Sequence, residues 1–193
     1  MEDTGRRFDG VKIAAYCESI LKKVGAPAEH AHMVASSLIA ANFRGVDTHG
    51  VTRLPIYVER IQAGLMDAKA SGTVVSEGPA SMVYDGQNGM GQVVGTKAMR
   101  LCLDKAEKSG VAFTTVRNSN HFGTAAYYAM MALERDMIGF SITNSPPVMA
   151  PWGGKKGFLG TNPLAIAVPA GEERPFIFDM ATSVVARGAV ILA

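Results

Sequence analysis

The sequence has almost no charge imbalance and no long hydrophobic run. Of its 193 residues, 19 are Lys or Arg and 17 are Asp or Glu, which leaves a formal net charge of +2. Such a small excess, spread along the chain, is not the electrostatic pattern of a nucleic-acid-binding protein. The longest clearly apolar run, residues 125–133, is about half as long as a membrane span requires. We therefore expect neither nucleic acid nor a membrane as a partner.

Cysteine is scarce as well. The chain contains only Cys17 and Cys102, and both lie in apolar helical patterns. This distribution predicts two buried thiols rather than a disulfide framework. The N-terminal segment has no apolar core of the kind that defines a signal peptide, and the sequence contains no Asn-X-Ser/Thr glycosylation site. We therefore expect a soluble protein of the cytoplasm.

Several familiar catalytic motifs are missing. The sequence has no HExxH, CxxC or GxSxG, and Gly154-Lys155 is not followed by Ser or Thr as in a phosphate-binding loop. Residues 89–95 are rich in glycine and lie between an expected strand and an expected helix. Their spacing is GxGxxxG, and the next strand offers no acidic residue for a ribose hydroxyl. We interpret them as a closely packed helix start rather than a dinucleotide fingerprint.

The first third of the chain has the periodicity of helices. Apolar residues recur at three- and four-residue steps between Asp9, which is placed to cap a first helix, and Gly25, which is placed to end it. The same pattern predicts a second helix over residues 28–43 and a third that ends near Gly64. Residues 44–50, between these two, contain two glycines and several polar side chains, which predicts a turn.

After Ser71 the pattern changes to short β-branched runs that alternate with helical stretches. Strands interleaved with helices predict an α/β architecture in which at least part of the sheet is parallel. We therefore expect a helical segment over residues 1–70 and a layered α/β region with a mixed sheet over residues 71–193. The expected strands are 73–75, 81–84, 111–116, 138–143, 164–168 and 176–178, and the expected helices are 92–108 and 124–134.

Two further segments are unusual for a compact domain. Residues 144–163 contain four prolines, four glycines and the only Trp. A connection of this length is usually functional, and we expect it to close over the site with Trp152 as an apolar wall. The chain ends on the apolar run 184–193. We therefore expect a fragment, incomplete at its C-terminus, whose exposed apolar surfaces lead to a homodimer or to larger assemblies.

The four histidines fall into two groups. His30 and His32 lie two residues apart on an expected helix, so they point to different faces and suit solvent better than a metal ion. His49 and His121 lie in polar turns bounded by glycine, where catalytic groups are often held, and Arg53 follows one turn after His49. A base that titrates near neutral pH and a guanidinium for a carboxylate are what oxidation of a 2-hydroxy acid requires. On spacing alone, both histidines can equally be structural, and Arg53 a solvated residue on a helix face.

Four separated motifs resemble those of the type 2 malate/L-lactate dehydrogenase family, which includes ureidoglycolate, sulfolactate and cyclic-imino-acid members. The motifs are RGVDTHGV at 44–51 leading into RLP at 53–55, SNHFG at 119–123, GTNPL at 160–164 and DMATS at 179–183. The resemblance implies a non-Rossmann α/β fold that binds NAD or NADP and moves hydride between it and a small 2-oxo acid or cyclic imino acid. Residues 1–70 then lie on the substrate side, and residues 71–193 form the cofactor-binding region.

The resemblance also implies roles for individual residues. It makes His121 the proton acceptor and gives Thr48 and His49 a relay role, although many members have Ser at the position of Thr48. Arg53 and Thr161 become substrate contacts. The implied cofactor contacts are His121, Phe122, Gly123, Thr124, Ala125, Asp179, Met180 and Ala181.

Other interpretations remain open at this point. The chain can be a non-catalytic remnant or a binding module of the same fold. Without the resemblance, Asp179 is better explained as a carboxylate at a strand end that caps residues 181–183. A hydrolase that uses His121 is disfavoured, because no Ser or Cys nucleophile stands beside a base in a known motif. The sequence alone selects neither the oxo acid nor NAD over NADP.

Overall fold

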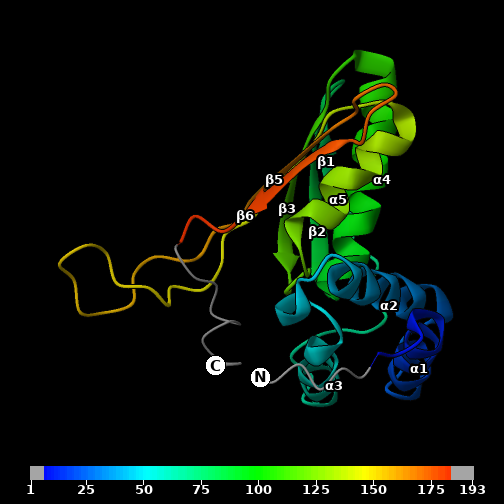
Figure 1. Ribbon diagram of the computed structural model, residues 1–193, viewed down its shortest axis with the longest axis vertical. Coiled ribbons are helices and arrows are strands. Elements are labelled where there is room, and N and C mark those ends of the chain that lie inside the picture. Colours follow the sequence, from blue (N-terminus) through cyan, green and yellow to red (C-terminus); the bar gives the residue numbers. More distant parts are fainter. Residues whose placement is uncertain (1–6, 184–193) are drawn as a thin grey trace. The chain divides into compact units, whose positions relative to one another are not determined.

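The computed structural model describes residues 7–183 (Figure 1). Their contacts divide the chain into two compact units. Within the described range, the first unit covers residues 7–123 and the second covers residues 124–183. The expected boundary after residue 70 lies inside the first unit, and the division into a substrate side and a cofactor-binding region stays a prediction. The apolar run 184–193, which motivated the expectation of a fragment, lies outside the described residues.

The three expected N-terminal helices are confirmed. Helix α1 spans Gly10–Lys23, and the Asp9 side chain caps it by accepting hydrogen bonds from the first free backbone N–H groups. Helix α2 spans Ala28–Phe43, and helix α3 spans Leu54–Gln62. Helices α1 and α3 each bury one apolar side, whereas α2 is buried nearly all round, and their apolar side chains pack together because exposing them to water costs free energy.

A small mixed sheet completes the first unit. Strands β1 (Thr73–Glu77), β2 (Ser81–Gly89) and β3 (Phe113–Ser119) lie in that order, with β1 antiparallel and β3 parallel to β2. Helix α4 (Gly91–Ser109) provides the crossover between the two parallel strands. The expectation of a mixed α/β architecture is therefore confirmed, and the one parallel pair brings the ends of β2 and β3 to the same edge of the sheet.

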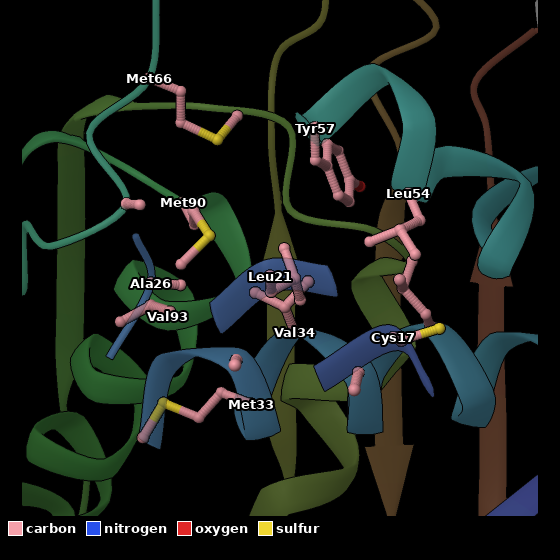
Figure 2. Packing of buried hydrophobic residues seen from close by; sticks show 14 residues of the cluster. Cys17, Leu21, Ala26, Met33, Val34, Leu54, Tyr57, Met66, Met90 and Val93 are labelled. Carbon is pink, nitrogen blue, oxygen red and sulfur yellow. The ribbon is translucent and has the colours of Figure 1, made fainter. Parts of the chain in front are cut away.

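The core of the first unit joins its helical and α/β parts. Buried side chains of α1, α2 and α3 pack with residues at the start of α4 and with the segment that precedes the sheet (Figure 2). Tyr57 of α3 lies in this cluster and is 2% exposed, so its hydroxyl needs a polar partner inside the protein. The labelled members in Figure 2 are Cys17, Leu21, Ala26, Met33, Val34, Leu54, Tyr57, Met66, Met90 and Val93.

The second unit is a short helix on an antiparallel sheet. Helix α5 spans Ala125–Met131 and continues as a 3₁₀ turn over Ala132–Arg135, where one longer helix was expected. The sheet order is β4-β5-β6. Its strands are β4 (Gly139–Ile142), β5 (Leu164–Val168) and β6 (Phe176–Met180).

Residues 144–163 contain no helix and no strand. A single bridge between Met149 and Leu159 closes their middle part into a hairpin-like loop. Trp152, near its tip, is fully exposed. Closure of this segment over the site, with Trp152 as an apolar wall, stays a prediction. None of the helices within residues 7–183 has the length and apolarity needed to cross a membrane.

Candidate active site

His49 lies in a short 3₁₀ turn, Asp47–His49, that the end of α2 holds in place. Asn42 of α2 donates from Nδ2 to a carboxylate oxygen of Asp47 at 2.5 Å and accepts from the backbone N–H of Val51 at 2.9 Å. Gly50 packs against this amide, because a Cβ there would lie 2.2 Å from Asn42 Oδ1. The glycine of the motif is therefore required by close packing, and the turn is rigidly attached to α2.

Thr48, His49 and Arg53 form a connected polar group. Thr48 Oγ1 and His49 Nδ1 share a hydrogen bond of 2.9 Å, and Arg53 Nε donates to the carbonyl of Thr48 at 2.5 Å. The extra methyl of Thr48 does not prevent its hydroxyl from reaching the imidazole. The inner end of the guanidinium is fixed, which leaves its terminal nitrogens to meet a ligand.

His121 follows β3 in a loop whose backbone is fixed on two sides. Asn120 donates from Nδ2 to the carbonyl of Gly89 and accepts at Oδ1 from Arg60, both at 3.0 Å. A Cβ on Gly91, at the start of α4, would lie 2.3 Å from the carbonyl oxygen of Asn120 and 2.4 Å from that of His121. The interpretation of the glycine-rich stretch as a closely packed helix start is therefore confirmed.

The fold brings His49 and His121 together. Their ring centroids are 5.5 Å apart, with an angle of 24° between the planes. From α3, the hydroxyl of Tyr57 lies 2.7 Å from His121 Nδ1. Gln92 of α4, 1% exposed, donates from Nε2 to the same hydroxyl at 2.8 Å. Four segments of the first unit therefore converge on one polar group.

The electrostatics of this group favour uncharged imidazoles. Removal from water, with His49 and the Arg53 charge nearby, lowers the pKa of His121 to about 4 from its ordinary 6.5. Burial, followed by the charge of Arg53, lowers the pKa of His49. Burial raises the pKa of Tyr57 to about 12. The site at neutral pH thus combines two neutral imidazoles, a neutral phenol and one guanidinium, whereas a histidine that titrates near neutrality was expected.

Such an arrangement suits a small anion that exchanges a proton. A guanidinium binds a carboxylate through two parallel hydrogen bonds, and a neutral imidazole either accepts a proton or donates an N–H hydrogen bond. A bound carboxylate adds negative charge beside both histidines, which favours their protonated forms. Within residues 7–183, no group of three or more His, Cys, Asp or Glu side chains is arranged to hold a metal ion.

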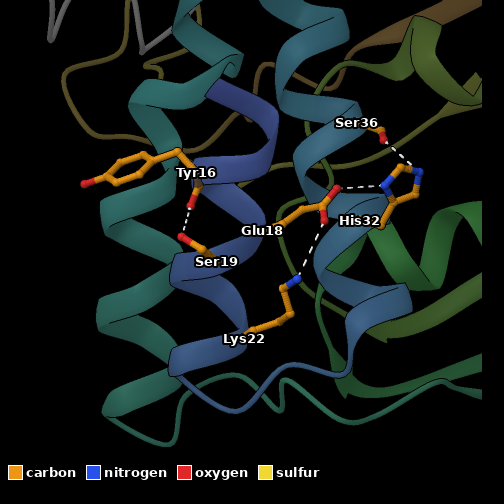
Figure 3. Close-up of polar contacts among 6 residues, drawn as sticks. All are labelled: Tyr16, Glu18, Ser19, Lys22, His32 and Ser36. Carbon is orange, nitrogen blue, oxygen red and sulfur yellow. Dashed lines mark hydrogen bonds and ion pairs between the residues drawn. The ribbon is translucent and has the colours of Figure 1, made fainter. Parts of the chain in front are cut away.

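The other two histidines lie elsewhere and differ from each other. His32 is exposed as expected and binds Glu18, which also pairs with Lys22 (Figure 3). The expectation of solvent exposure was wrong for His30, which is 3% exposed. Its Nδ1 lies 3.0 Å from the carbonyl of Ala68, so it is a buried structural histidine that anchors the segment before the sheet.

The remaining site residues lie at the boundary or in the second unit. Phe122 and Gly123 end the first unit, whereas Thr124 and Ala125 begin the second. Thr161 is held by a 2.9 Å hydrogen bond between its hydroxyl and that of Ser145. Asp179, followed by Met180 and Ala181, lies in the last described strand.

Asp179 has a clear structural contact. Its Oδ2 accepts from the backbone N–H of Ala126 at 3.1 Å. The carboxylate therefore caps the start of α5. Its expected capping of residues 181–183 stays a prediction. Its expected contact with a cofactor stays a prediction.

Comparison with known proteins identifies the family. The model of the malate/L-lactate dehydrogenase family matches residues 9–193. This chain belongs to that family. The malate dehydrogenase of Pyrococcus abyssi is 48% identical over 177 residues, and the L-sulfolactate dehydrogenase of Methanocaldococcus jannaschii is 46% identical over 174 residues. The solved malate dehydrogenase of Pyrococcus horikoshii OT3 is 45% identical, with a TM-score of 0.93.

The match covers most of this chain and about half of each relative. The alignments span 92% of the chain against 49% of the P. abyssi protein, and 90% against 50% of the M. jannaschii protein. The structural match covers 96% of this chain and 53% of the P. horikoshii chain. This chain therefore spans about half the length of the relatives that it matches.

Sequence reasoning missed two members of the polar group. Tyr57 falls on the apolar stripe of α3, so the pattern marks it as a core residue, and Gln92 was assigned only as the start of a helix. One signal was available for Gln92: an amide side chain stands directly before Val93 and Val94, both fully buried. A polar residue beside two core residues at a helix start indicates a buried hydrogen bond.

Proposed function

We propose that this chain is part of an enzyme that transfers hydride between NAD or NADP and a small 2-hydroxy or 2-oxo acid of the malate or lactate type. The observation that carries the proposal is the group formed by His49, His121 and Arg53, with the two imidazoles 5.5 Å apart. Hydride transfer from a hydroxyl-bearing carbon requires a nearby acceptor for the hydroxyl proton. A proton acceptor and a carboxylate ligand in one place match this reaction.

His121 is assigned as the proton acceptor. It is neutral at physiological pH, because its pKa is about 4, so it can take up a proton. His49 and Thr48 form the second proton-exchanging pair, joined by their 2.9 Å hydrogen bond. They orient the substrate and pass the proton outward.

Arg53 is assigned to the substrate carboxylate. Its bond to the Thr48 carbonyl at 2.5 Å fixes the plane of the guanidinium, which makes a two-point contact with a carboxylate geometrically defined. Thr161 is proposed as a second substrate contact. A cyclic imino acid carries the same carboxylate and is an acceptable alternative substrate.

The residues expected to meet a nicotinamide cofactor are chemically compatible with it. Gly123 has φ +83° and no side chain, and beside it lies Ser37, whose buried Oγ has no hydrogen-bond partner among residues 7–183. Because Gly123 has no side chain, a planar ring can approach its backbone closely. The hydroxyl of Ser37 can form a hydrogen bond with the amide that a nicotinamide ring carries. We propose that residues 121–125 and 179–181 hold this cofactor, which when bound supplies or accepts the hydride.

The remaining parts of the proposal concern cellular context. The composition supports a cytoplasmic location, and the exposed apolar surfaces support a homodimer. The relatives named malate and sulfolactate dehydrogenase support a dicarboxylic or sulfonated hydroxy acid as substrate.

The test has a binding part and a turnover part. NADH and NADPH are titrated against the purified chain by fluorescence, and loss of nicotinamide absorbance is followed with oxaloacetate, pyruvate, sulfopyruvate and a cyclic imino acid. We expect saturable binding of at least one cofactor and turnover of at least one substrate. Binding without turnover supports a binding module, and the failure of both cofactors to bind supports a non-catalytic remnant. Either result overturns the proposal for this chain.

A further inference from the structure

The buried hydroxyl of Tyr57 lies between Gln92, which has no role in the proposed reaction, and His121, the proposed proton acceptor. On one side, Gln92 Nε2 donates to it at 2.8 Å, and on the other it lies 2.7 Å from His121 Nδ1. Tyr57 is 2% exposed and Gln92 is 1% exposed, so water does not compete for these bonds. The three side chains form a linear chain of hydrogen bonds from the core to the edge of the site.

The direction of these bonds follows from the number of protons. A phenol has one proton to donate, and an amide nitrogen only donates. Because Gln92 donates to the Tyr57 oxygen, the proton of Tyr57 is available for the lone pair of His121 Nδ1. In the opposite arrangement, the oxygen would accept from both neighbours and its own proton would lack a partner in a dry environment, which is unfavourable.

We infer that Gln92, acting through Tyr57, holds His121 in the tautomer whose proton is on Nε2. Tyr57 and Gln92 are therefore positioning residues for this imidazole. Within residues 7–183, Nε2 has no hydrogen-bond partner. Although the Nδ1 edge of the ring faces the buried hydroxyl of Tyr57, the residue keeps part of its surface exposed to solvent. The free edge of the ring thus presents an N–H donor.

Other contacts fix the rest of His121. Asn120 bonds to Gly89 and Arg60, and Gly91 packs directly against the backbone of the loop, so the position of the Cα does not depend on Tyr57. The remaining freedom is the orientation and protonation of the ring, which the contact with Tyr57 controls. A high pKa of Tyr57, about 12, keeps its proton in place over the physiological range.

The consequence for recognition rests on the proposed function. The carbonyl oxygen of a 2-oxo acid only accepts hydrogen bonds, so an N–H at Nε2 can donate to it. A protonated Nε2 cannot accept the proton of the hydroxyl of a 2-hydroxy acid. The resting site is therefore arranged for the oxo form of the substrate. Proton uptake from a hydroxy acid requires the ring proton to move to Nδ1 and the hydroxyl of Tyr57 to turn.

The tautomer is measured directly by ¹⁵N NMR of the histidine side chains, in solution or by magic-angle spinning on sedimented protein. A bare and a protonated ring nitrogen have well-separated shifts, and His121→Asn assigns the signals. We expect one protonated nitrogen, Nε2, in the unaltered chain. Tyr57→Phe removes the hydroxyl that donates to Nδ1. Gln92→Leu removes the amide that makes this hydroxyl donate toward His121. In each variant, the ¹⁵N shifts of the two ring nitrogens should therefore move toward their average.

Tyr84→Phe is the matched control. Tyr84 is also buried, at 4% exposure, and its hydroxyl donates to the carbonyl of Ser71 at 2.6 Å, away from His121. This variant should leave the His121 signals unchanged. If the Tyr57→Phe protein does not fold, the Gln92→Leu protein provides the second test.

Two results would overturn the inference: a proton on Nδ1 in the unaltered chain, or an unchanged tautomer in both Tyr57→Phe and Gln92→Leu. The NMR titration gives a further readout, since the groups facing His121 are His49, Arg53 and Tyr57. Loss of the Tyr57 donor should raise the pH at which the His121 signals titrate, while Tyr84→Phe should not. None of these measurements needs turnover, so failure of the proposed enzymatic function would be seen separately in the cofactor and substrate assays.

Discussion

The guanidinium of Arg53 is held by the protein at Nε, while its terminal nitrogens can bind a ligand. Its Nε donates to the carbonyl of Thr48, so the terminal nitrogens of the guanidinium are presented as a planar pair. Lys keeps the positive charge but has neither the planar two-point contact nor the Nε bond. Arg53→Lys should weaken use of the oxo acid by about 2 kcal/mol or more in kcat/KM, while the affinity for NADH stays unchanged.

The control for this variant is Arg100→Lys, an equivalent change at an exposed position of α4. It should leave both constants unchanged. Equal losses of oxo-acid use and of NADH affinity in Arg53→Lys would show that Arg53 is structural.

The two histidines of the site should differ in their kinetic effects. His121→Asn removes the proposed acceptor and should lower kcat by about 10²-fold or more, with a much smaller change in cofactor affinity. His49→Asn should lower kcat less and raise KM more, because His49 bonds to Thr48 and lies close to Arg53. Steady-state kinetics on the active protein measure both effects. The reverse pattern would make His49 the base.

The stability of the first unit should depend on the protonation of His121. Its folded pKa is about 4, below the ordinary 6.5, so the unfolded chain binds more protons between these values. The free energy of unfolding should therefore fall as pH drops from about 6.5 through about 4. His121→Asn lacks this group, so its stability should fall less steeply in that window.

Urea unfolding at a series of pH values measures this difference. Above the ordinary pKa of histidine the stability difference between the two proteins should be constant, which provides an internal control. Parallel curves from neutral pH down to about 4 would contradict the lowered pKa of His121.

At the scale of elements, the site depends on the close contact between the start of α4 and the loop after β3. Gly91→Ala should destabilise the protein by about 1–3 kcal/mol, although Ala is the better helix former, because its Cβ would meet two backbone oxygens at 2.3 and 2.4 Å. Backbone oxygens move only with the loop, so the position of His121 should change too. Chemical unfolding measures the first effect, and the His121 ¹⁵N signals measure the second.

Gly78→Ala is the matched control for Gly91→Ala. A Cβ on Gly78, in the turn between β1 and β2, would meet only the hydroxyl of Ser81 at 3.0 Å, and this side chain can rotate away. Its effect on stability should be small. A Gly91→Ala protein as stable as the unaltered chain would show that the loop adjusts freely.

The sequence predicted elements well where local signals agree and less well where distant contacts decide. Helix α2 was predicted with its observed bounds, and Asp9 and Gly25 end α1 as expected, because capping and apolar periodicity are local. Strand β2 extends to Gly89, beyond its β-branched part, since its end pairs with Ser119 of β3. Pairing partners are not encoded in the strand itself.

The site shows the same division. Glycine-bounded turns identified His49 and His121, but only the fold brings their rings to 5.5 Å. His30 looked solvent-exposed by its spacing from His32, and it is buried because the segment that carries Ala68 and Ser71 packs over it. Long-range packing of this kind, not local pattern, decides whether a polar residue is at the surface.

At the scale of the whole molecule, the second unit has an uncovered apolar face. Paired residues of adjacent strands share a face, and Phe140, Ile166 and Phe178 are paired across β4, β5 and β6. Gly139 lies on the opposite face, against α5, where a Cβ would lie close to the carbonyl of Ala129. The full apolar face consists of Phe140, Ile142, Leu164, Ile166, Val168, Phe176, Phe178 and Met180.

This face should make the 193-residue chain associate with itself. Phe140 and Phe178 are 51% and 38% exposed, and the sequence of β5, LAIAV, is typical of a strand that is buried on both faces. Apolar surface of this extent is rarely left in water by a monomer. Light scattering should therefore report a dimer or larger species. The double variant Phe140→Thr/Phe178→Thr should shift the mass toward the monomer, because Thr keeps strand propensity without the apolar ring. Phe113→Thr, at a 61% exposed position of β3, is the control and should not shift it. A sharp monomer peak with a cooperative melt for the unaltered chain would contradict this prediction.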